Sequence, residues 1–280
     1  MTSHVSSKTV NADKEFAFVT ADFEAVRKRL KKIAGINLAD SKDSMVYSRL
    51  SRRIRHLKMS SFSQYLRYVD STESEHQEFV NSLTTNLTSF FREQHHFDAL
   101  KQHIAANGNK PIRIWCAASS TGEEPYSIAI TAVEALGKFD IPVSIIASDI
   151  DSNVLKTASD GVYKIEQLDA FDSARKKRFF RRGKGANNGF VKVVPELRKL
   201  IEFKRINLMD DTWDLPNGLD IVFCRNVMIY FDKPTQLQIL NKIVRHMAPH
   251  SYYYAGHSEN FGHVNSLLKP LGKTIYQPKI

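Results

Sequence analysis

The sequence predicts an α/β domain with a parallel sheet at its centre, preceded by a separate all-helical region. From Asp22 to about Asn107, apolar residues recur at helical spacing and no strand pattern interrupts them. After residue 108, short apolar runs alternate with helical segments, which is typical of a parallel sheet covered on both faces. Residues 163–200 break this alternation, and we expect a small antiparallel β-subdomain inserted there.

The first region should contain five helices, separated by Gly35, Ser60-Ser61 and Asp70-Ser71-Thr72. Residues 1 to about 20 are polar and lack a sustained period, so we expect a loose tail. The break at Asn107-Gly108-Asn109-Lys110-Pro111 predicts a domain boundary, which gives units at 1–20, 21–107 and 108–280. The expected helices are Asp22–Ala34, Ser44–Lys58, Ser61–Val69, Glu73–Asn86 and Gln94–Ala106.

The second region should contain four apolar strands and three helices between them. In the insertion, a basic helix-like segment and a glycine-rich turn precede an alternating run at Phe190–Val194. The expected strands are Ile112–Cys116, Val143–Ala147, Ile201–Ile206 and Asp220–Phe223, and the expected helices are Glu123–Leu136, Ser152–Ser159 and Pro234–His246.

Composition narrows the possible functions. With 280 residues, 42% of them apolar, the chain is a globular protein of about two domains. A net charge of +10 argues for an acidic partner: nucleic acid, an anionic membrane surface or an acidic protein. The two cysteines, Cys116 and Cys224, exclude a disulfide scaffold and are expected to be small buried residues.

Targeting and metal signals are missing from the sequence. No apolar stretch is long enough to span a bilayer, and the polar N-terminus lacks an apolar signal core, so we expect a cytoplasmic protein. His95-His96 has no companion at metal-ligand spacing, and we expect no metal site.

A small-residue loop follows the first expected strand, in the segment CAASSTGEEPYSIA (Cys116–Ala129). Gly122 is its only glycine, so the dinucleotide fingerprint is absent. Glu123 and Glu124 stand where they would repel a phosphate, so the loop suits a cationic or hydroxyl-rich ligand. The alternative is that both acids only complement the dipole of the following helix.

Polar residues also end two other strands. In IIASDID (Ile145–Asp151), Asp149 or Asp151 is placed to bind both hydroxyls of a ribose, while the other caps the next helix. In FCRNVMIYFDK (Phe223–Lys233), Arg225 and Asn226 follow a buried strand. The alternative there is an ordinary loop in which Asp232 caps a helix.

The fourth segment, LTTNLTSFFRE (Leu83–Glu93), ends the helical region. Phe90 and Phe91 are most simply core or interface anchors. Asn86, Thr88 and Arg92 supply polar groups with no evident structural use, although a capped helix end with a solvated Arg is the plainer interpretation.

Taken together, these segments resemble the CheR family, the chemoreceptor glutamate O-methyltransferases that use S-adenosylmethionine. The resemblance covers residues 20 to 278. It departs at APHSYYYAGHSE (Ala248–Glu259), where the family has a Pro-Gly-Gly-like turn, so the shape of this turn is in doubt. The motifs stand in the family's order and spacing: LTTNLTSFFRE, CAASSTGEEPYSIA, ASDID, INL at Ile206–Leu208, CRNVMIYF and AGHSENF.

The resemblance implies a Rossmann-like S-adenosylmethionine methyltransferase domain with the inserted β-subdomain, after an all-α N-terminal domain. It implies that Asp149 takes the ribose hydroxyls, that Asn207 and Leu208 border the adenine, and that Arg92 and Tyr230 lie nearest the transferred methyl. The full implied cofactor set is Asn86, Thr88, Arg92, Glu123, Asp149, Asn207, Leu208, Arg225 and Asn226.

The chemistry needs no general base. A glutamate carboxylate has a pKa of about 4.3 and is already a nucleophile at neutral pH. Catalysis should therefore come from in-line placement and exclusion of water, with S-adenosylhomocysteine as the product.

A basic surface is expected on the helical region. Between Arg27 and Lys58, eleven Lys and Arg residues stand against two acids. On the helix at Ser44–Lys58, Arg49, Arg52, Arg53 and His56 fall on one side of the apolar stripe. An acidic receptor helix would need such a surface, and the resemblance supports that use for Arg52, Arg53 and Arg55.

Two other functions stay open. The charge of +10 also suits a nucleic-acid methyltransferase, but the sequence has neither a Pro-Pro-Tyr-like loop after the fourth strand nor a Pro-Cys dipeptide. A non-catalytic receptor-binding module with the same fold is the third possibility. We further expect a monomer whose β-subdomain offers an edge strand around Phe190–Val194 to a receptor C-terminal peptide.

Overall fold

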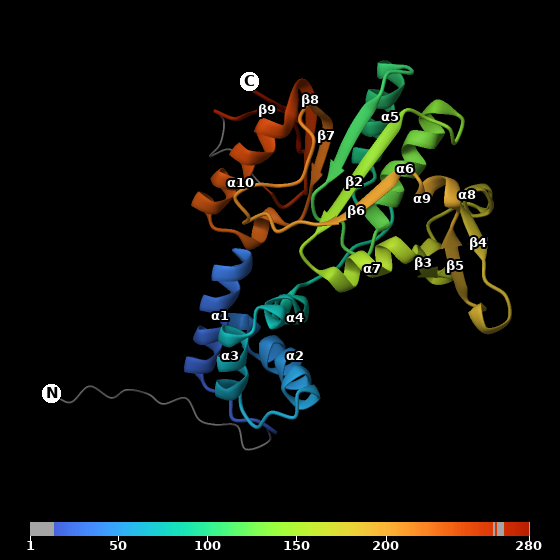
Figure 1. Ribbon diagram of the computed structural model, residues 1–280. Coiled ribbons are helices and arrows are strands. Elements are labelled where there is room, and N and C mark those ends of the chain that lie inside the picture. The colour runs from blue at the N-terminus through green and yellow to red at the C-terminus, as the bar shows by residue number, and fades with distance from the viewer. Residues whose placement is uncertain (1–13, 260, 262–265, 280) are drawn as a thin grey trace. The chain divides into compact units, whose positions relative to one another are not determined.

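The computed structural model describes residues 14–259, 261 and 266–279, and the chain divides into two compact units, Met1–Thr85 and Asn86–Ile280 (Figure 1). The boundary predicted at residue 107 is therefore wrong by one helix. The helix at 95–107 buries Phe97, Leu100 and Ile104 in the core of the second unit. The composition break at residues 107–111 is only the end of that helix, where Gly108 takes a φ of 63°.

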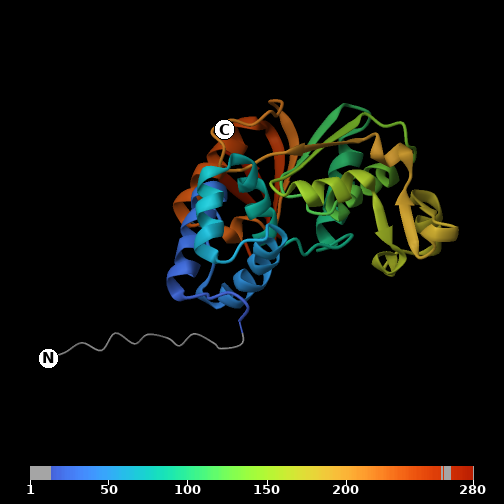
Figure 2. The same cartoon turned by 60° about the horizontal axis from the view of Figure 1, so that its bottom comes forward.

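The first unit is a bundle of four α-helices that pack on one another (Figures 1 and 2). Val46, Leu50 and Ile54 form the buried stripe that the sequence predicts. The fourth helix ends at Leu83, three residues before the predicted end, because the backbone becomes extended at Thr84. The elements are α1 (Thr20–Ala34), η1 (Asp40–Lys42), α2 (Asp43–His56), α3 (Phe62–Ser71) and α4 (Glu73–Leu83).

Part of the expected N-terminal tail belongs to this bundle. Phe16 is buried, and the ring of Phe18 lies 4.5 Å from that of Phe62 and 5.7 Å from that of Tyr47. The prediction of a loose tail is therefore wrong for residues 14–20, whose aromatic side chains the sequence analysis overlooked. Residues 1–13 lie outside the described part of the chain.

The second unit is built on a seven-stranded sheet of order β6-β2-β1-β7-β8-β10-β9. The first five strands in this order pair in parallel, and β10 runs antiparallel to both of its neighbours. The predicted parallel core is confirmed. The strands are β1 (Ile112–Cys116), β2 (Val143–Asp149), β6 (Ile201–Arg205), β7 (Leu219–Cys224), β8 (Met247–Ala255), β9 (Leu268–Gly272) and β10 (Ile275–Pro278).

The last three strands were not predicted. The segment MAPHSYYYA contains a proline and two polar residues and gives no clear alternation, yet it forms β8 and buries Tyr253 and Tyr254 completely. The segment at Ala248–Tyr254, whose shape was in doubt, is thus a strand next to β7.

Two hydrophobic cores lie on the two faces of this sheet. On β1, Ile114 and Cys116 face the core that contains α5 and α6, whereas Trp115 faces the core that contains α10. Cys116 and Cys224 are both buried, as expected, and burial raises the pKa of each thiol. Outside the insertion, the described helices of this unit are α5 (His95–Asn107), α6 (Glu123–Leu136), α7 (Ser152–Asp160), η4 (Met228–Tyr230) and α10 (Lys233–His246).

The insertion forms a separate three-stranded antiparallel sheet of order β3-β5-β4 (Figure 1). The predicted β-subdomain and the overall fold class are confirmed. One detail is wrong: Phe190–Val193 is the central strand, paired on both sides, so it offers no free edge. The elements are β3 (Val162–Lys164), η2 (Ile165–Leu168), α8 (Ser173–Phe179), β4 (Phe180–Arg182), η3 (Gly185–Asn187), β5 (Phe190–Val193) and α9 (Pro195–Arg198).

Within the described ranges, none of the helices combines the length and the apolar character needed to cross a bilayer.

Candidate functional site

The carboxyl ends of four parallel strands, β6, β2, β1 and β7, meet at one edge of the large sheet. Polar segments follow each of them, and in open α/β sheets this edge is where ligands bind. The predicted cofactor residues come from these segments and from the segment Asn86–Glu93, which precedes α5 in the same unit.

Of the two acids Asp149 and Asp151, the structure identifies the one that caps the next helix. Asp151 caps α7, because its carboxylate accepts from the backbone N–H groups of Asn153 (2.9 Å) and Val154 (3.4 Å). Asp149, at the tip of β2, accepts backbone N–H groups from Ser120 (2.9 Å) and Asp151 (3.0 Å), and the N–H of Ile150 also stabilises its charge. A carboxylate has about four acceptor positions, so these bonds do not fill those of Asp149.

Burial raises the pKa of Asp149 to about 6, although the N–H groups that it accepts partly offset this rise. The carboxylate is therefore mostly ionised at neutral pH but close to its titration range. A buried acceptor with spare lone pairs fits the hydroxyl groups of a ribose.

Glu123 begins α6 and is almost fully buried. Thr121 Oγ1 donates to Oε2 (2.6 Å) and Gln167 Nε2 donates to Oε1 (3.0 Å), while burial raises the pKa of this carboxyl. The preceding Gly122 has a φ of 100°, and a Cβ there would lie 2.6 Å from the hydroxyl oxygen of Tyr163. The close approach of Tyr163 therefore requires glycine at this position.

The segment after β6 is held by hydrogen bonds between its backbone and nearby side chains. Asn207 Oδ1 accepts from Met209 N (3.0 Å), and the Asn207 carbonyl accepts from Trp213 Nε1 (3.1 Å). Leu208 is buried in the same core as Trp213, and its carbonyl accepts from Lys242 Nζ (3.0 Å). The two residues that the resemblance places beside the adenine thus have fixed positions.

The segment Asn86–Glu93 is tied to the strand tips at both ends. At its start, Asn86 Nδ2 donates to Asp151 Oδ2 (2.8 Å), and the Asn86 carbonyl accepts from Ser120 Oγ (3.0 Å). Phe90 is the anchor that the sequence suggested: it packs edge-on against aromatic residues of the inserted subdomain, Tyr163, Phe171 and Phe180.

Arg225 has a different role from the one that its motif suggested, because its fully buried side chain already has protein partners. Its guanidinium donates to Glu124 Oε2 (2.8 Å) and to the Arg92 carbonyl (2.6 Å), and it lies 3.3 Å from Glu93 Oε2. Arg225, which follows β7, therefore joins the first turn of α6 to the segment before α5. Sequence reasoning missed this role of Glu93 and Glu124, since their partners are distant in the chain.

Another buried carboxylate, that of Glu259, supports the same edge of the sheet. It accepts backbone N–H groups from Val227 (2.9 Å), Met228 (2.8 Å) and Gly256 (2.6 Å). Burial raises its pKa, and these three bonds counter the rise. Glu259 lies in the AGHSENF motif, so the motif could have indicated it.

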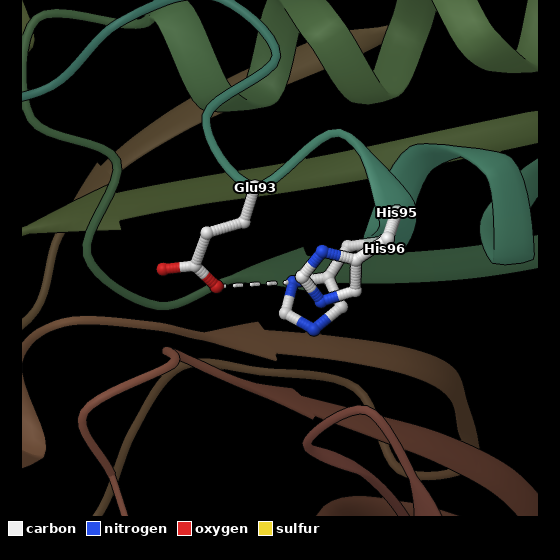
Figure 3. Close-up of side chains that lie close together, drawn as sticks. All are labelled: Glu93, His95 and His96. Atoms are coloured by element: carbon white, nitrogen blue, oxygen red, sulfur yellow. Dashed lines mark ion pairs between the residues drawn. The ribbon is translucent and has the colours of Figure 1, made fainter.

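Glu93, His95 and His96 form the one group of potential metal ligands among the described residues, with ligand atoms within 4.8 Å of one another (Figure 3). The carboxylate, however, faces the Arg225 guanidinium and accepts from His257 N (3.1 Å). His96 Nε2 lies 2.9 Å from the Lys273 carbonyl, which can only accept, so Nε2 carries the hydrogen. A metal ion would bring a second cation beside a buried guanidinium, so this arrangement favours the ion pair.

The two residues predicted nearest the reaction are only half-buried. Arg92 donates from Nη1 to the Leu87 carbonyl (3.0 Å). The Tyr230 side chain makes no hydrogen bond, ion pair or ring contact with any other described residue, and neither does that of Thr88. Both hydroxyl groups are thus available to a ligand.

The helical unit carries a second candidate site, an open groove of about 430 Å³ between α2 and the end of α4. Three of the four predicted receptor-binding arginines line it, and Arg55 is outside it. Arg55 pairs with Glu15 instead. The lining residues are Arg49, Arg52, Arg53, His56, Asn81, Ser82 and Thr84.

The arginines of this groove differ in how far they are already engaged. Arg53 makes a two-point ion pair with the buried Glu75 (2.8 and 2.5 Å), which also accepts from the Tyr65 hydroxyl (3.0 Å). Arg49 donates to the Thr84 carbonyl (2.5 Å). The exposed Arg52 makes no ion pair or hydrogen bond with any residue that the structure describes.

Known proteins match the chain over both units. The family model described as the CheR methyltransferase SAM binding domain matches residues 86–277, and that of the CheR methyltransferase all-alpha domain matches residues 21–84. Chemotaxis protein methyltransferase 2 of Pseudomonas aeruginosa is 53% identical over 271 residues, which cover 96% of this chain and 97% of the relative. The chemotaxis protein methyltransferases of Salmonella typhimurium and Escherichia coli are each 42% identical over 273 residues, which cover 97% of this chain and 94% and 95% of theirs.

The matched domains name S-adenosylmethionine as the cofactor, and the strand-tip site fits it: acceptor carboxylates for hydroxyl groups stand where a phosphate-binding loop would need glycines. This chain belongs to the CheR family of S-adenosylmethionine-dependent chemotaxis methyltransferases.

Proposed function

We propose that the protein transfers the methyl group of S-adenosylmethionine to glutamate side chains on the cytoplasmic helices of chemoreceptors, with glutamate methyl esters and S-adenosylhomocysteine as products. The names of the relatives support a role in chemotaxis. The observation that carries the acidic substrate is the groove lined by Arg49, Arg52 and Arg53, since a cationic groove complements a helix that presents glutamates.

In the proposed complex the cofactor lies along the sheet edge. Asp149 accepts from the ribose hydroxyls, and Asn207 and Leu208 border the adenine. Glu123, Asn86, Thr88 and Asn226 surround the remainder. Arg225 stands next to Asn226 in this set, but its side chain is occupied by Glu93, Glu124 and the Arg92 carbonyl. We therefore expect Arg225 to position its neighbours and not to bind the cofactor through its guanidinium.

The cofactor supplies an electrophilic methyl group on a positively charged sulfur. The substrate carboxylate is already ionised at neutral pH, so one of its oxygens forms the new bond as the methyl–sulfur bond breaks, and no proton moves. The protein has to align the two groups and exclude water. Arg92 holds the incoming carboxylate or that of the cofactor, and the Tyr230 hydroxyl steers it.

Further proposals concern the protein's surroundings. The protein acts as a cytoplasmic monomer. The C-terminal peptide of a receptor adds to an edge of the small sheet, and the edges available for this are β3 and β4, since β5 is central.

Methylation of a soluble receptor fragment tests the proposal. We expect label from the donor's methyl group to appear on the fragment and to be released by base, as an ester requires. Arg52→Glu should lower kcat/KM for the fragment about tenfold while the affinity for the cofactor is unchanged, because Arg52 is the arginine of the groove whose donors have no partner among the described residues.

Lys28→Glu is the matched control, since it reverses an exposed charge on α1 that has no ion-pair partner among the residues the structure describes. Equal effects of the two variants would contradict the assignment of the groove. Label on RNA or DNA but not on the receptor would favour a nucleic-acid methyltransferase. Cofactor and receptor binding without any transfer would favour a non-catalytic module.

A further inference from the structure

The segment before α5 has unusual backbone conformations. Phe91 and Glu93 are not glycines, yet they have φ values of 53° and 60°. Two residues at the neighbouring strand tips, Ser120 (48°) and Asn226 (58°), share this left-handed conformation. Such residues are strained and persist only where the surrounding structure holds them, most often at functional sites.

The contacts of the Glu93 carboxylate explain what holds this segment. It accepts from Asn226 Nδ2 (3.4 Å), which follows β7, and from the backbone N–H of His257 (3.1 Å), which follows β8. It also pairs with Arg225, whose guanidinium donates to the carbonyl of Arg92. One side chain thus joins two strand tips to the segment that carries Arg92.

The carboxylate remains charged in this position. Burial alone would raise its pKa, but the Arg225 guanidinium and the N–H of His257 outweigh burial and lower it. The neighbouring His96 is buried and, because burial lowers its pKa to about 4, it is neutral at pH 7. A neutral His96 provides no second cation, so Arg225 is the cation that holds Glu93.

We infer that Glu93 is a positioning residue of the cofactor site. It acts through Asn226, whose amide it orients, and through Arg92, whose main chain it fixes by way of Arg225. The inference rests on the proposed placement of Asn226 and Arg92 beside the cofactor, and it does not depend on the receptor substrate.

A double-mutant cycle on cofactor affinity tests this role. Glu93→Gln keeps the shape of the side chain and removes its charge, and we expect it to raise the Kd for S-adenosylhomocysteine about tenfold. Asn226→Ala should cause a similar loss. If Glu93 acts through Asn226, the double variant should bind about as weakly as the weaker single variant, and not a hundredfold more weakly than wild type.

The control is Glu134→Gln. Glu134 pairs with Arg175 at 2.7 and 2.6 Å in the same unit, and its side chain is 16% exposed against 14% for Glu93, but it lies near the end of α6, away from the strand tips. Its loss should leave the Kd within about twofold of wild type. A merely structural ion pair would affect stability in the same way at either place.

Three outcomes would overturn the inference: folded Glu93→Gln binding as wild type does, the two losses multiplying in the double variant, or Glu134→Gln matching Glu93→Gln. If Glu93→Gln fails to fold, Glu93→Asp serves in the same cycle, since it keeps the charge and shortens the reach. The measurement needs no receptor, so it separates this inference from the proposal on receptor methylation.

Discussion

Two clusters of arginines and glutamates, one in each unit, differ in how many of their arginines are paired with carboxylates. At the strand tips Arg225 is fully buried between Glu93 and Glu124. In the helical unit Arg53 pairs with the buried Glu75, while the neighbouring Arg52 is exposed and has no partner among the described residues. An arginine in a sequence motif can therefore have a structural role, as Arg225 has. An arginine on a helix surface, such as Arg52, can be the one whose donors remain accessible to a ligand.

The difference follows from desolvation. A guanidinium that is removed from water needs partners, as Nη1 and Nη2 of Arg225 have, and those donors are then not available to a ligand. An exposed guanidinium keeps its donors but contributes little to stability. The state of pairing, which the sequence does not reveal, decides between the two roles.

The largest effect should come from breaking the pair in the helical unit. Arg53→Met leaves the Glu75 carboxylate buried without its cation, and we expect a loss of about 3 kcal/mol in the free energy of opening of α2. Hydrogen exchange of the α2 amides in the full chain measures this loss locally. Arg53→Glu, the reversal that the predicted receptor contact would suggest, is thus a poor probe of receptor binding.

Arg52→Met is the control for this prediction. It removes an exposed charge one residue away, so α2 should lose less than about 0.5 kcal/mol. Equal losses at the two positions would show that the Arg53–Glu75 pair contributes no more than a surface charge, and the contrast between the two arginines would fail.

The next effect concerns the acceptor at the tip of β2. Asp149→Ala removes the carboxylate proposed to take both ribose hydroxyls, and hydrogen bonds to a charged group contribute roughly 1.5–3 kcal/mol each. We expect the Kd for S-adenosylhomocysteine, measured by calorimetry, to rise about a hundredfold. The exposed Asp169→Ala should leave it unchanged; a loss of less than threefold in Asp149→Ala would move the ribose elsewhere.

The sequence was a good guide wherever local patterns set the structure. Apolar periodicity located α6 with both ends correct, and the strand at Ile112–Cys116 as well. The acidic residues at the end of β2 indicated the cap of α7, because an N-cap needs a short polar side chain directly before the helix, as Asp151 is. The three strands after α10 were not predicted because their residues depend on partners across the sheet, as Tyr253 of β8 does on Tyr276 of β10.

Long-range pairing was equally hidden at the candidate site. Nothing near Arg225 in the chain shows that Glu124, 101 residues away, occupies its Nη1 group. The same holds for Glu93 and His257, which are 164 residues apart. The sequence could place polar residues at the strand tips but could not show which of them pair with one another.

The smallest effect is a dependence of the cofactor affinity on pH, which arises from Asp149 in the second unit. Because burial raises the pKa of Asp149 to about 6, the group gains a proton below that pH and loses an acceptor position for the ribose. The affinity for S-adenosylhomocysteine should fall as the pH drops, about fivefold between pH 6 and pH 5, and Asp149→Asn should bind weakly with little dependence on pH in this range.

The titration of Asp149 does not by itself favour unfolding in acid, since its effect on the free energy of unfolding has the opposite sign. Its pKa is raised on folding, so the folded state takes up a proton between about pH 4 and pH 6 that the unfolded chain does not, and this group stabilises the fold as the pH falls. His96 acts against it: its pKa is lowered to about 4, so the stability that it contributes is lost as the pH falls from about 6.5 towards 4. Near-UV circular dichroism at pH 5 separates the two, because a native spectrum with weakened binding assigns the loss to Asp149, whereas a spectrum that disappears together with binding assigns it to unfolding.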